Sequence, residues 1–276
     1  MKKTHIFLGL IIAILISIPG IHAQASDKSL KMATTTSTDG TGLLDYLIPQ
    51  FKNQTGIALE WIPTGTGNAL KLGQDCNVDV LLVHAPEAEA AFIKSGFGKD
   101  RKQIMYNDFV IIGPESDPAG IKGKKVSDAL DIIRTGQAVF VSRGDDSGTH
   151  KKEKQLWQST RKPLPEKEAW YLQIGKGMQA TILLCEEKKG YTMTDRGSYI
   201  KYQSVQNNTA PLKILIEGDD ILLNQYSVLT LDPKNCPHAK YDLALEFLNW
   251  MASPGTQKLI GDFKLLGQTL FVPNAQ

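Results

Sequence analysis

One short polar segment, with the sequence SRGDDSGTH, combines an arginine with hydroxyl side chains and glycines. Arg143 is the only strong cation in this segment and in the two polar turns described below. Its fork-shaped set of N–H donors suits oxygen anions, and Asp145 can hold the guanidinium in one orientation. Ser147, Gly148 and Thr149 add hydroxyl and backbone N–H donors just before a predicted helix. The segment predicts binding of a compact oxyanion, with a surface Arg–Asp pair on a turn as the alternative.

Two further polar turns also lie between a predicted strand and a predicted helix. The turn over residues 34–42 has no apolar side chain, and its alternative role is helix capping by Ser37 or Asp39. The turn over residues 63–68 contains glycines that let the backbone approach a ligand, and its alternative role is a loop capped by Asn68. Because N–H groups at helix starts lack intrahelical partners, the three turns together predict many donors around one dehydrated anion.

A catalytic interpretation of Ser147 is weaker than a binding one. The stretch 144–148 (GDDSG) is similar to the nucleophile segment of trypsin-like serine proteases, and His84 or His150 would have to act as the base. That family has a second glycine where this chain has Thr149, and its fold is all-β. We therefore expect no enzyme activity and no catalytic residue, with an envelope serine hydrolase as a remote alternative.

The charge balance and the cysteines bear on other classes of partner. The chain has 31 Lys and Arg against 29 Asp and Glu, a net charge of +2, so no basic surface for nucleic acid is indicated. No CxxC motif or histidine cluster is present, and we expect neither a protein-bound metal nor a cofactor. Cys76, Cys185 and Cys236 are far apart, which in an oxidising compartment predicts one disulfide and one buried thiol without assigning the pair.

Residues 1–25 have the features of a secretory signal peptide: two lysines, an apolar run from Ile6 to Ile18, and a small-residue pattern ending at Ala25. The apolar run is shorter than the roughly 20 residues that cross a bilayer. No cysteine lies near the cleavage region, so a lipid anchor is not expected. The sequence predicts cleavage after Ala25 and a periplasmic protein that is formally neutral without its leader.

After the leader, short apolar runs alternate with amphipathic stretches, a pattern typical of an α/β fold. The stretch 115–125, rich in Pro, Gly and charge, marks a first crossing between domains, and a strand predicted at 212–216 leads back. We predict two lobes, with lobe 1 formed by residues 26–112 and 217–276, lobe 2 formed by residues 113–216, and a ligand site in the cleft between them.

Four segments together resemble the tungstate-binding periplasmic proteins of ABC transporters: ATTTST at 33–38, YNDFV at 106–110, RGDDSGT at 143–149 and GYTMTDRG at 190–197. The resemblance covers nearly all of the chain after the leader. It implies a type II periplasmic binding-protein fold that closes around tungstate, and delivery of the ion to a membrane permease with its ATPase. We also expect a monomer.

By position, the resemblance implies a set of ligand donors in each lobe. These are Thr35, Thr36 and Ser37 in the first turn, Thr64, Thr66 and Gly67 in the second turn, and Arg143, Ser147, Gly148 and Thr149 in lobe 2.

His84 bears on which anion is bound. Phosphate-binding relatives tend to carry an Asp at this strand end, where it accepts a hydrogen bond from protonated phosphate. Tungstate and molybdate are fully deprotonated near neutral pH, so a donor such as His84 suits them better. An ordinary buried or solvated histidine is the alternative. Molybdate, phosphate and sulfate are kept as alternative ligands, and sequence chemistry alone does not separate tungstate from molybdate.

Overall fold

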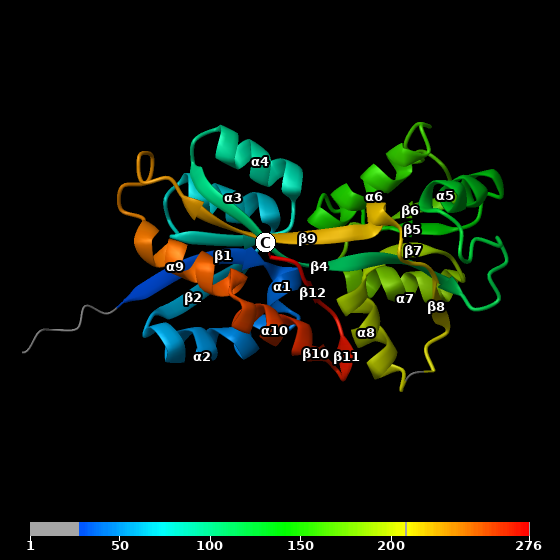
Figure 1. The fold of residues 1–276 in the computed structure, drawn as a ribbon. Coiled ribbons are helices and arrows are strands. Elements are labelled where there is room, and N and C mark those ends of the chain that lie inside the picture. The colour runs from blue at the N-terminus through cyan, green and yellow to red at the C-terminus, as the bar shows by residue number, and fades with distance from the viewer. Residues whose placement is uncertain (1–27, 208, 276) are drawn as a thin grey trace, which may run out of the picture.

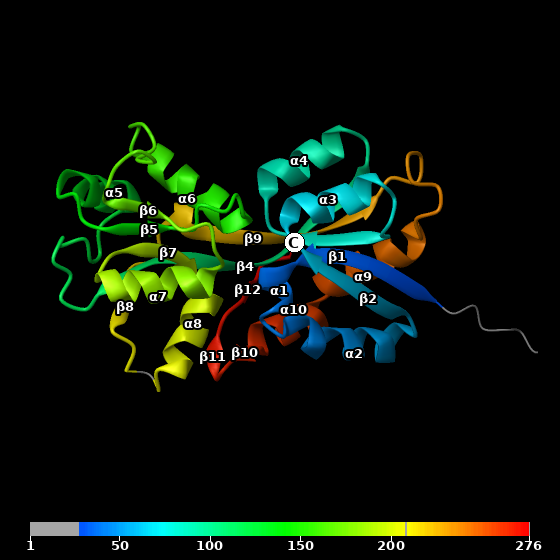
Figure 2. The same cartoon turned by 180° about the vertical axis from the view of Figure 1, so that it is seen from behind.

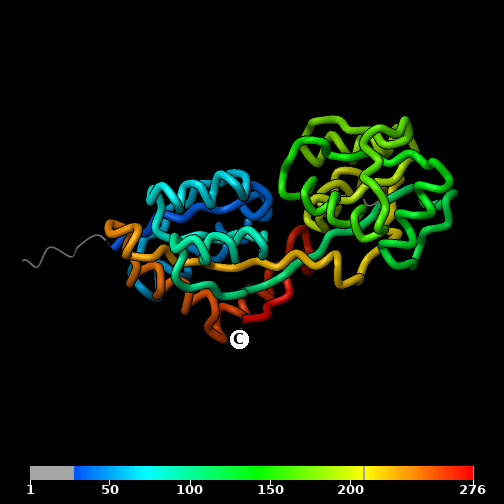
Figure 3. Tube along the Cα trace, turned by 90° about the horizontal axis from the view of Figure 1, so that it is seen from above, coloured from blue at the N-terminus to red at the C-terminus, as the bar shows by residue number. Residues whose placement is uncertain are grey.

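The protein consists of two α/β lobes joined by the strands β4 (Gly98–Pro114) and β9 (Leu223–Leu231) (Figure 1). The computed structural model describes residues 28–207 and 209–275, and the predicted signal peptide lies outside them. Seen from above, these two strands run side by side from one lobe into the other (Figure 3). The predicted two-lobed α/β fold is confirmed.

Lobe 1 is built on a mixed sheet that contains part of β4, β9 and the strands β1 (Ser29–Thr35), β2 (Ala58–Thr64), β3 (Val80–Val83) and β12 (Val272–Pro273). β1 pairs in parallel with β2 and β3, whereas β9 runs antiparallel to β3 and β4. Successive side chains enter opposite cores: Met32 and Val80 belong to one, and Ala33 and Leu81 belong to the other. Both faces are therefore covered, which explains the unbroken apolar sequence of β3.

Helices cover both faces of this sheet (Figure 2). They are α1 (Thr36–Asp39), α2 (Leu43–Thr55), α3 (Thr66–Gln74), α4 (Pro86–Lys94), α9 (Tyr241–Ala252) and α10 (Pro254–Asp262). α2 buries Leu44, Leu47 and Phe51, whose spacing of three and four residues puts them on one helix face. α2, α9 and α10 share one core, and α3 and α4 pack in the other. A short hairpin of β10 (Lys264–Leu265) and β11 (Gln268–Thr269) follows α10.

Lobe 2 forms around the far end of β4. It contains β5 (Phe140–Ser142), β6 (Tyr171–Gln173), β7 (Thr192–Asp195), β8 (Leu212–Ile216), α5 (Val126–Thr135), α6 (Gly148–Ser159), α7 (Met178–Lys188), α8 (Arg196–Val205) and the 3-10 helix η1 (Asp220–Leu222). Pairing of β4 with β9 ends at Asp108, and pairing with β7 begins at Phe109. β4 thus changes its partner between these two residues, and residue 112, after which the sequence analysis places the domain boundary, lies within β4. β8 ends at Ile216, and η1 lies between β8 and β9.

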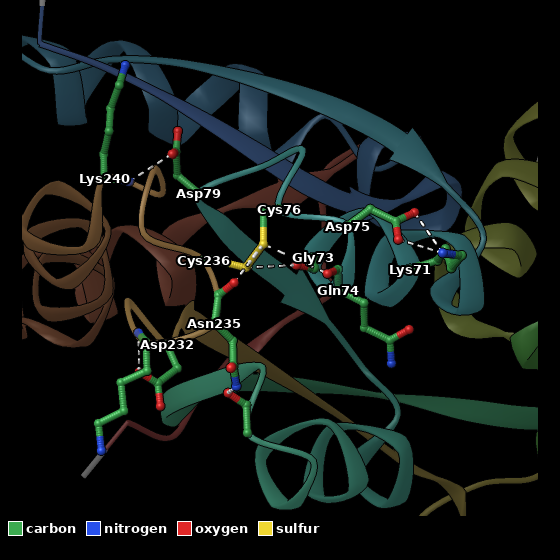
Figure 4. The surroundings of a disulfide bond; sticks show 12 residues. Lys71, Gly73, Gln74, Asp75, Cys76, Asp79, Asp232, Asn235, Cys236 and Lys240 are labelled. Atoms are coloured by element: carbon green, nitrogen blue, oxygen red, sulfur yellow. Dashed lines mark hydrogen bonds and ion pairs between the residues drawn. A yellow bond between two sulfur atoms is a disulfide. The ribbon is translucent and has the colours of Figure 1, made fainter.

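A disulfide between Cys76 and Cys236 joins the loop after α3 to the loop before α9 (Figure 4). Cys185 is a free thiol in the lobe 2 core, and burial raises its pKa. The predicted combination of one disulfide and one buried thiol is confirmed, and the structure adds the pairing. Within residues 28–207 and 209–275, no helix has both the length and the apolar composition to cross a membrane.

Candidate anion-binding site between the lobes

A pocket of about 670 Å³ opens between the two lobes. Its walls come from the starts of α3 and α4 in lobe 1 and from α6 in lobe 2, with residues of β9 between them. The lobes come close here, because a side-chain carbon added at Gly148 would lie 3.7 Å from Thr66 Oγ1. Five of the predicted site residues line the pocket, namely Thr66, Gly67, His84, Ser147 and Gly148.

One part of the lobe 1 wall is the turn between β2 and α3. Gly65 precedes the first turn of α3 with extended backbone and provides no side-chain cap. The N–H groups of Thr66, Gly67 and Asn68 therefore have no intrahelical partner. Added side-chain carbons at Gly65 and Gly67 would meet no atom within 4 Å, so the backbone on this side is open to a ligand.

The hydroxyl-rich turn after β1 is tied to the pocket by His84. Thr35 is buried and caps α1, because its Oγ1 accepts a hydrogen bond from the N–H of Thr38 at 3.2 Å. His84 Nε2 lies 3.0 Å from Thr35 Oγ1 and 3.3 Å from Ser37 Oγ. The capping residue of this turn is thus Thr35, a predicted ligand donor, rather than Ser37 or Asp39.

His84 follows β3 and contacts the crossing strand β9. Its Nδ1 is 2.8 Å from Asn224 Oδ1, and its ring stacks on Tyr226 with 4.6 Å between centroids and 26° between planes. Burial lowers the pKa of His84, and the hydrogen bond with Asn224 and the charge of Asp195 oppose this only in part. His84 is therefore neutral at neutral pH.

The lobe 2 wall is the start of α6 and the loop before it. Ser147 Oγ accepts a hydrogen bond from the N–H of His150 at 3.2 Å, and the Ser147 hydroxyl donates to Asp145 Oδ1 at 2.7 Å. Arg143 donates to the carbonyl of Lys176 at 2.9 Å and, through Nε and Nη2, to Asp145 Oδ2. Burial alone would raise the pKa of Asp145, but hydrogen bonds from Ser147 and Arg143 outweigh it and lower the pKa. The Asp145 carboxylate thus accepts hydrogen bonds from Arg143 and Ser147, which the sequence analysis predicts as donors to the bound anion.

The other predicted site residues are close to the pocket without lining it. Thr35 and Ser37 reach it through His84, and Thr64 at the end of β2 is the register partner of Thr35. The residues that do not line the pocket are Thr35, Thr36, Ser37, Thr64, Arg143 and Thr149.

The surroundings of Ser147 give the hydrolase alternative no base. The Ser147 hydroxyl donates to Asp145, and His150 Nδ1 instead accepts the N–H of Asp146 at 3.0 Å. His84 is engaged with Asn224 and with lobe 1 hydroxyls. In the part of the chain that the structure describes, no histidine ring is hydrogen-bonded to Ser147, so the geometry that nucleophile activation requires is missing.

Two cations that line the pocket, Lys151 and Lys152 of α6, were missed by the sequence analysis. Lys152 lines the pocket from α6, and its ammonium donates to the carbonyl of Leu223 at 3.3 Å. Burial lowers the pKa of Lys152, and the charge of Glu87 on α4 opposes the change. Lys152 stands four residues after Gly148, so helical spacing from the polar turn would have found it. The expectation that Arg143 is the only strong cation near the site is therefore wrong.

A buried network behind the lobe 2 wall supports the loop that carries Arg143. Glu153 on α6 accepts hydrogen bonds from the hydroxyls of Ser142 at 3.0 Å and Tyr171 at 2.5 Å. Burial raises the pKa of Glu153 to about 7, although these hydrogen bonds and one from the backbone of Arg143 favour the carboxylate. The end of β5 and the start of the loop are thus fixed from the interior of lobe 2.

Two α/β lobes, two crossing strands and a pocket between the lobes are the architecture of a periplasmic-type solute-binding protein. The chain belongs to the PBP superfamily, whose domain model matches residues 22–254. Within that superfamily it belongs to the family of tungstate-binding proteins named TupA. It is 49% identical over 240 residues to TupA of Campylobacter jejuni, a match that covers 87% of this chain and 89% of the relative.

Solved structures agree with this family assignment. The tungstate-binding protein TupA from Desulfovibrio alaskensis G20 is 63% identical with a TM-score of 0.87, and the match covers 90% of this chain and 99% of that one. The tungstate ABC transporter structure from Geobacter sulfurreducens is 44% identical with a TM-score of 0.74, covering 86% and 99%. These relatives are named as binding or transport components, so the chain is a binding protein and not an enzyme.

Proposed function

We propose that this protein captures tungstate in the periplasm and delivers it to the permease of an ABC transporter. The names of its relatives support tungstate as the ligand. The single observation that carries the proposal is that α3 of lobe 1 and α6 of lobe 2 both begin at one pocket, where Gly148 stands close to Thr66. A doubly charged ion that loses its water shell needs donors on all sides, and the two helix starts supply them from opposite walls.

The donors belong to both lobes and are mostly uncharged. The N–H groups at the start of α3, the hydroxyl of Ser37 and the donors of Ser147 and Gly148 face the ion, and Arg143 adds a guanidinium when the anion replaces Asp145 as its partner. Oriented dipoles of this kind hold an anion in a protein of nearly balanced charge. The proposed ligand donors are Thr36, Ser37, Thr64, Thr66, Gly67, Arg143, Ser147, Gly148 and Thr149, and Thr35 and His84 support Ser37 from inside lobe 1.

Competition calorimetry tests the ligand. Tungstate should bind with one ion per protein, and phosphate and sulfate should not displace it. Titration with molybdate measures the difference in affinity between tungstate and molybdate. Displacement of tungstate by phosphate or sulfate at equal concentration would instead assign the protein to another oxyanion. Absence of tungstate binding by a folded protein would reject the proposal.

The cellular part of the proposal concerns the leader and the partners. Cleavage of residues 1–25 releases a monomer into the periplasm, where the loaded protein meets the membrane permease and its ATPase. N-terminal sequencing of the protein from a periplasmic fraction should begin at Ser26. Sedimentation of the ligand-free and tungstate-loaded protein should give a monomer in both cases, and a dimer in either would contradict this part.

A further inference from the structure

Asn224 is a buried amide on β9, close to the crossing between the lobes. Its register partner on β4 is Asn107, one residue before the last pair that these strands form. The Asn224 side chain contacts three groups: Asn107 Oδ1 at 2.7 Å, the Tyr226 hydroxyl at 3.2 Å and His84 Nδ1 at 2.8 Å. Asn107, Asn224 and Tyr226 are all at most 5% exposed, so water does not substitute for these partners.

The directions of these hydrogen bonds fix the proton of His84. The Nδ2 group of Asn224 donates to Asn107 and Tyr226, which engages both of its hydrogens. Its Oδ1 can only accept, and among residues 28–207 and 209–275 the group that meets it is Nδ1 of His84. A neutral imidazole carries one proton, so the proton on Nδ1 leaves Nε2 as an acceptor.

An acceptor at Nε2 determines what the nearby hydroxyls can do. Thr35 Oγ1 already accepts from the N–H of Thr38, and with the Thr38 hydroxyl as donor in their 2.7 Å contact, the proton of Thr35 goes to His84 Nε2 at 3.0 Å. Thr35 and His84 then satisfy each other inside lobe 1. Ser37, at 3.3 Å from Nε2 and 3.1 Å from Thr35 Oγ1, is more exposed and has the longer contact with His84. Its hydroxyl proton is the one left for a ligand.

We propose that Asn224 is a positioning residue that fixes the His84 proton on Nδ1, so that Ser37, rather than His84 or Thr35, donates to the bound anion from the turn after β1. This corrects the expectation that His84 itself donates, and it rests on the proposed oxyanion function. The Asn224 amide also links the two crossing strands to the turn after β1. It is on β9, it donates to Asn107 on β4, and it contacts His84, which in turn contacts Thr35 at the end of β1.

Nitrogen-15 NMR of ligand-free, histidine-labelled protein tests the proton position directly. At neutral pH, His84 should show a protonated Nδ1 and an unprotonated Nε2. Asn224→Leu, which removes the acceptor, should move protonation toward Nε2. Asn224→Asp, which keeps an acceptor and adds a charge, should give an imidazolium protonated at both nitrogens. A wild-type spectrum with the proton on Nε2, or a spectrum of folded Asn224→Leu identical to wild type, would overturn the proposal.

The tungstate affinity of variants tests whether the Ser37 hydroxyl, rather than His84, donates to the ion. Ser37→Ala should weaken binding by about tenfold or more, the usual effect of removing a hydrogen bond to a charged group. His84→Gln should stay within a few-fold of wild type, because the Gln carbonyl can still accept from Thr35. The opposite order, with His84→Gln much weaker than Ser37→Ala, would mean that His84 donates to the ion. The NMR result does not depend on tungstate, so a protein that fails to bind tungstate rejects the proposed function without deciding the proton position.

Discussion

Arg143→Ala tests the electrostatic part of the site. Arg143 donates to Asp145 and to the carbonyl of Lys176, and a bound dianion would compete with Asp145 for the guanidinium. Truncating one partner of a hydrogen-bonded charge pair costs about 2–5 kcal/mol, which is roughly thirty-fold to several thousand-fold in affinity. Isothermal titration with tungstate measures the loss, and an unchanged melting temperature of the ligand-free protein shows that the fold survives.

Asp145 supplies a matched control for this variant. Without Arg143, the Asp145 carboxylate keeps only its hydrogen bonds from Ser147, and the anion that binds Ser147 then meets an unpaired negative charge. At a separation of about 5 Å and an effective dielectric of about 20, the repulsion is roughly 3 kcal/mol per unit charge before salt screening. The double variant Arg143→Ala/Asp145→Asn should therefore bind more tightly than Arg143→Ala alone. Equal or weaker binding by the double variant, or unchanged affinity of Arg143→Ala, would refute this reasoning.

Three further outcomes are expected. Lys152→Gln should weaken tungstate binding about three- to tenfold at low salt, because the ammonium lines the pocket, and the difference should shrink at high salt; a salt-independent difference would contradict a charge effect. Glu153→Gln should change the pH dependence of stability: the raised pKa contributes about 3 kcal/mol to folding below pH 4.5, and this contribution is lost as the pH rises through about 7. The melting temperature of Glu153→Gln relative to wild type should therefore rise between pH 5 and pH 8, and parallel curves would reject a titrating Glu153. Replacing Cys76 and Cys236 together by Ser should lower the free energy of unfolding by about 2–5 kcal/mol in denaturant titrations, because the bond closes a long loop, with tungstate affinity of the folded protein unchanged.

Much of the fold was predictable because local patterns agree with it. Apolar residues recur at helical spacing over 43–51 and 240–251, and α2 and α9 are found there. The run 212–216 predicted a strand and is β8. The first half of β4 was not predicted, because residues 98–103 are mostly polar or charged and their partner β9 is more than a hundred residues away. α8 begins at Arg196 in a segment without a strong apolar period, so its helix depends on tertiary packing.

Some residues of the candidate site could likewise be predicted from local sequence, and others could not. Polar turns before helices are local features, so Thr66, Gly67, Ser147 and Gly148 could be named from the sequence, and all four line the pocket. The role of Asn224 could not be found in this way, because its contacts with Asn107 and His84 span 117 and 140 residues. An amide in a strand has no signature until the partner strands are known.

The size of the pocket implies that closure contributes to binding. At about 670 Å³ it greatly exceeds a four-oxygen ion, which is comparable to a few water molecules of roughly 30 Å³ each. One lobe presents the uncapped start of α3, and the other presents Ser147 and the two lysines Lys151 and Lys152. An ion on one wall therefore stays partly hydrated, and it loses the remaining water only when the other wall reaches it. We expect the crossing strands to carry this motion, so contacts at the crossing such as that of Asn107 with Asn224 should influence affinity.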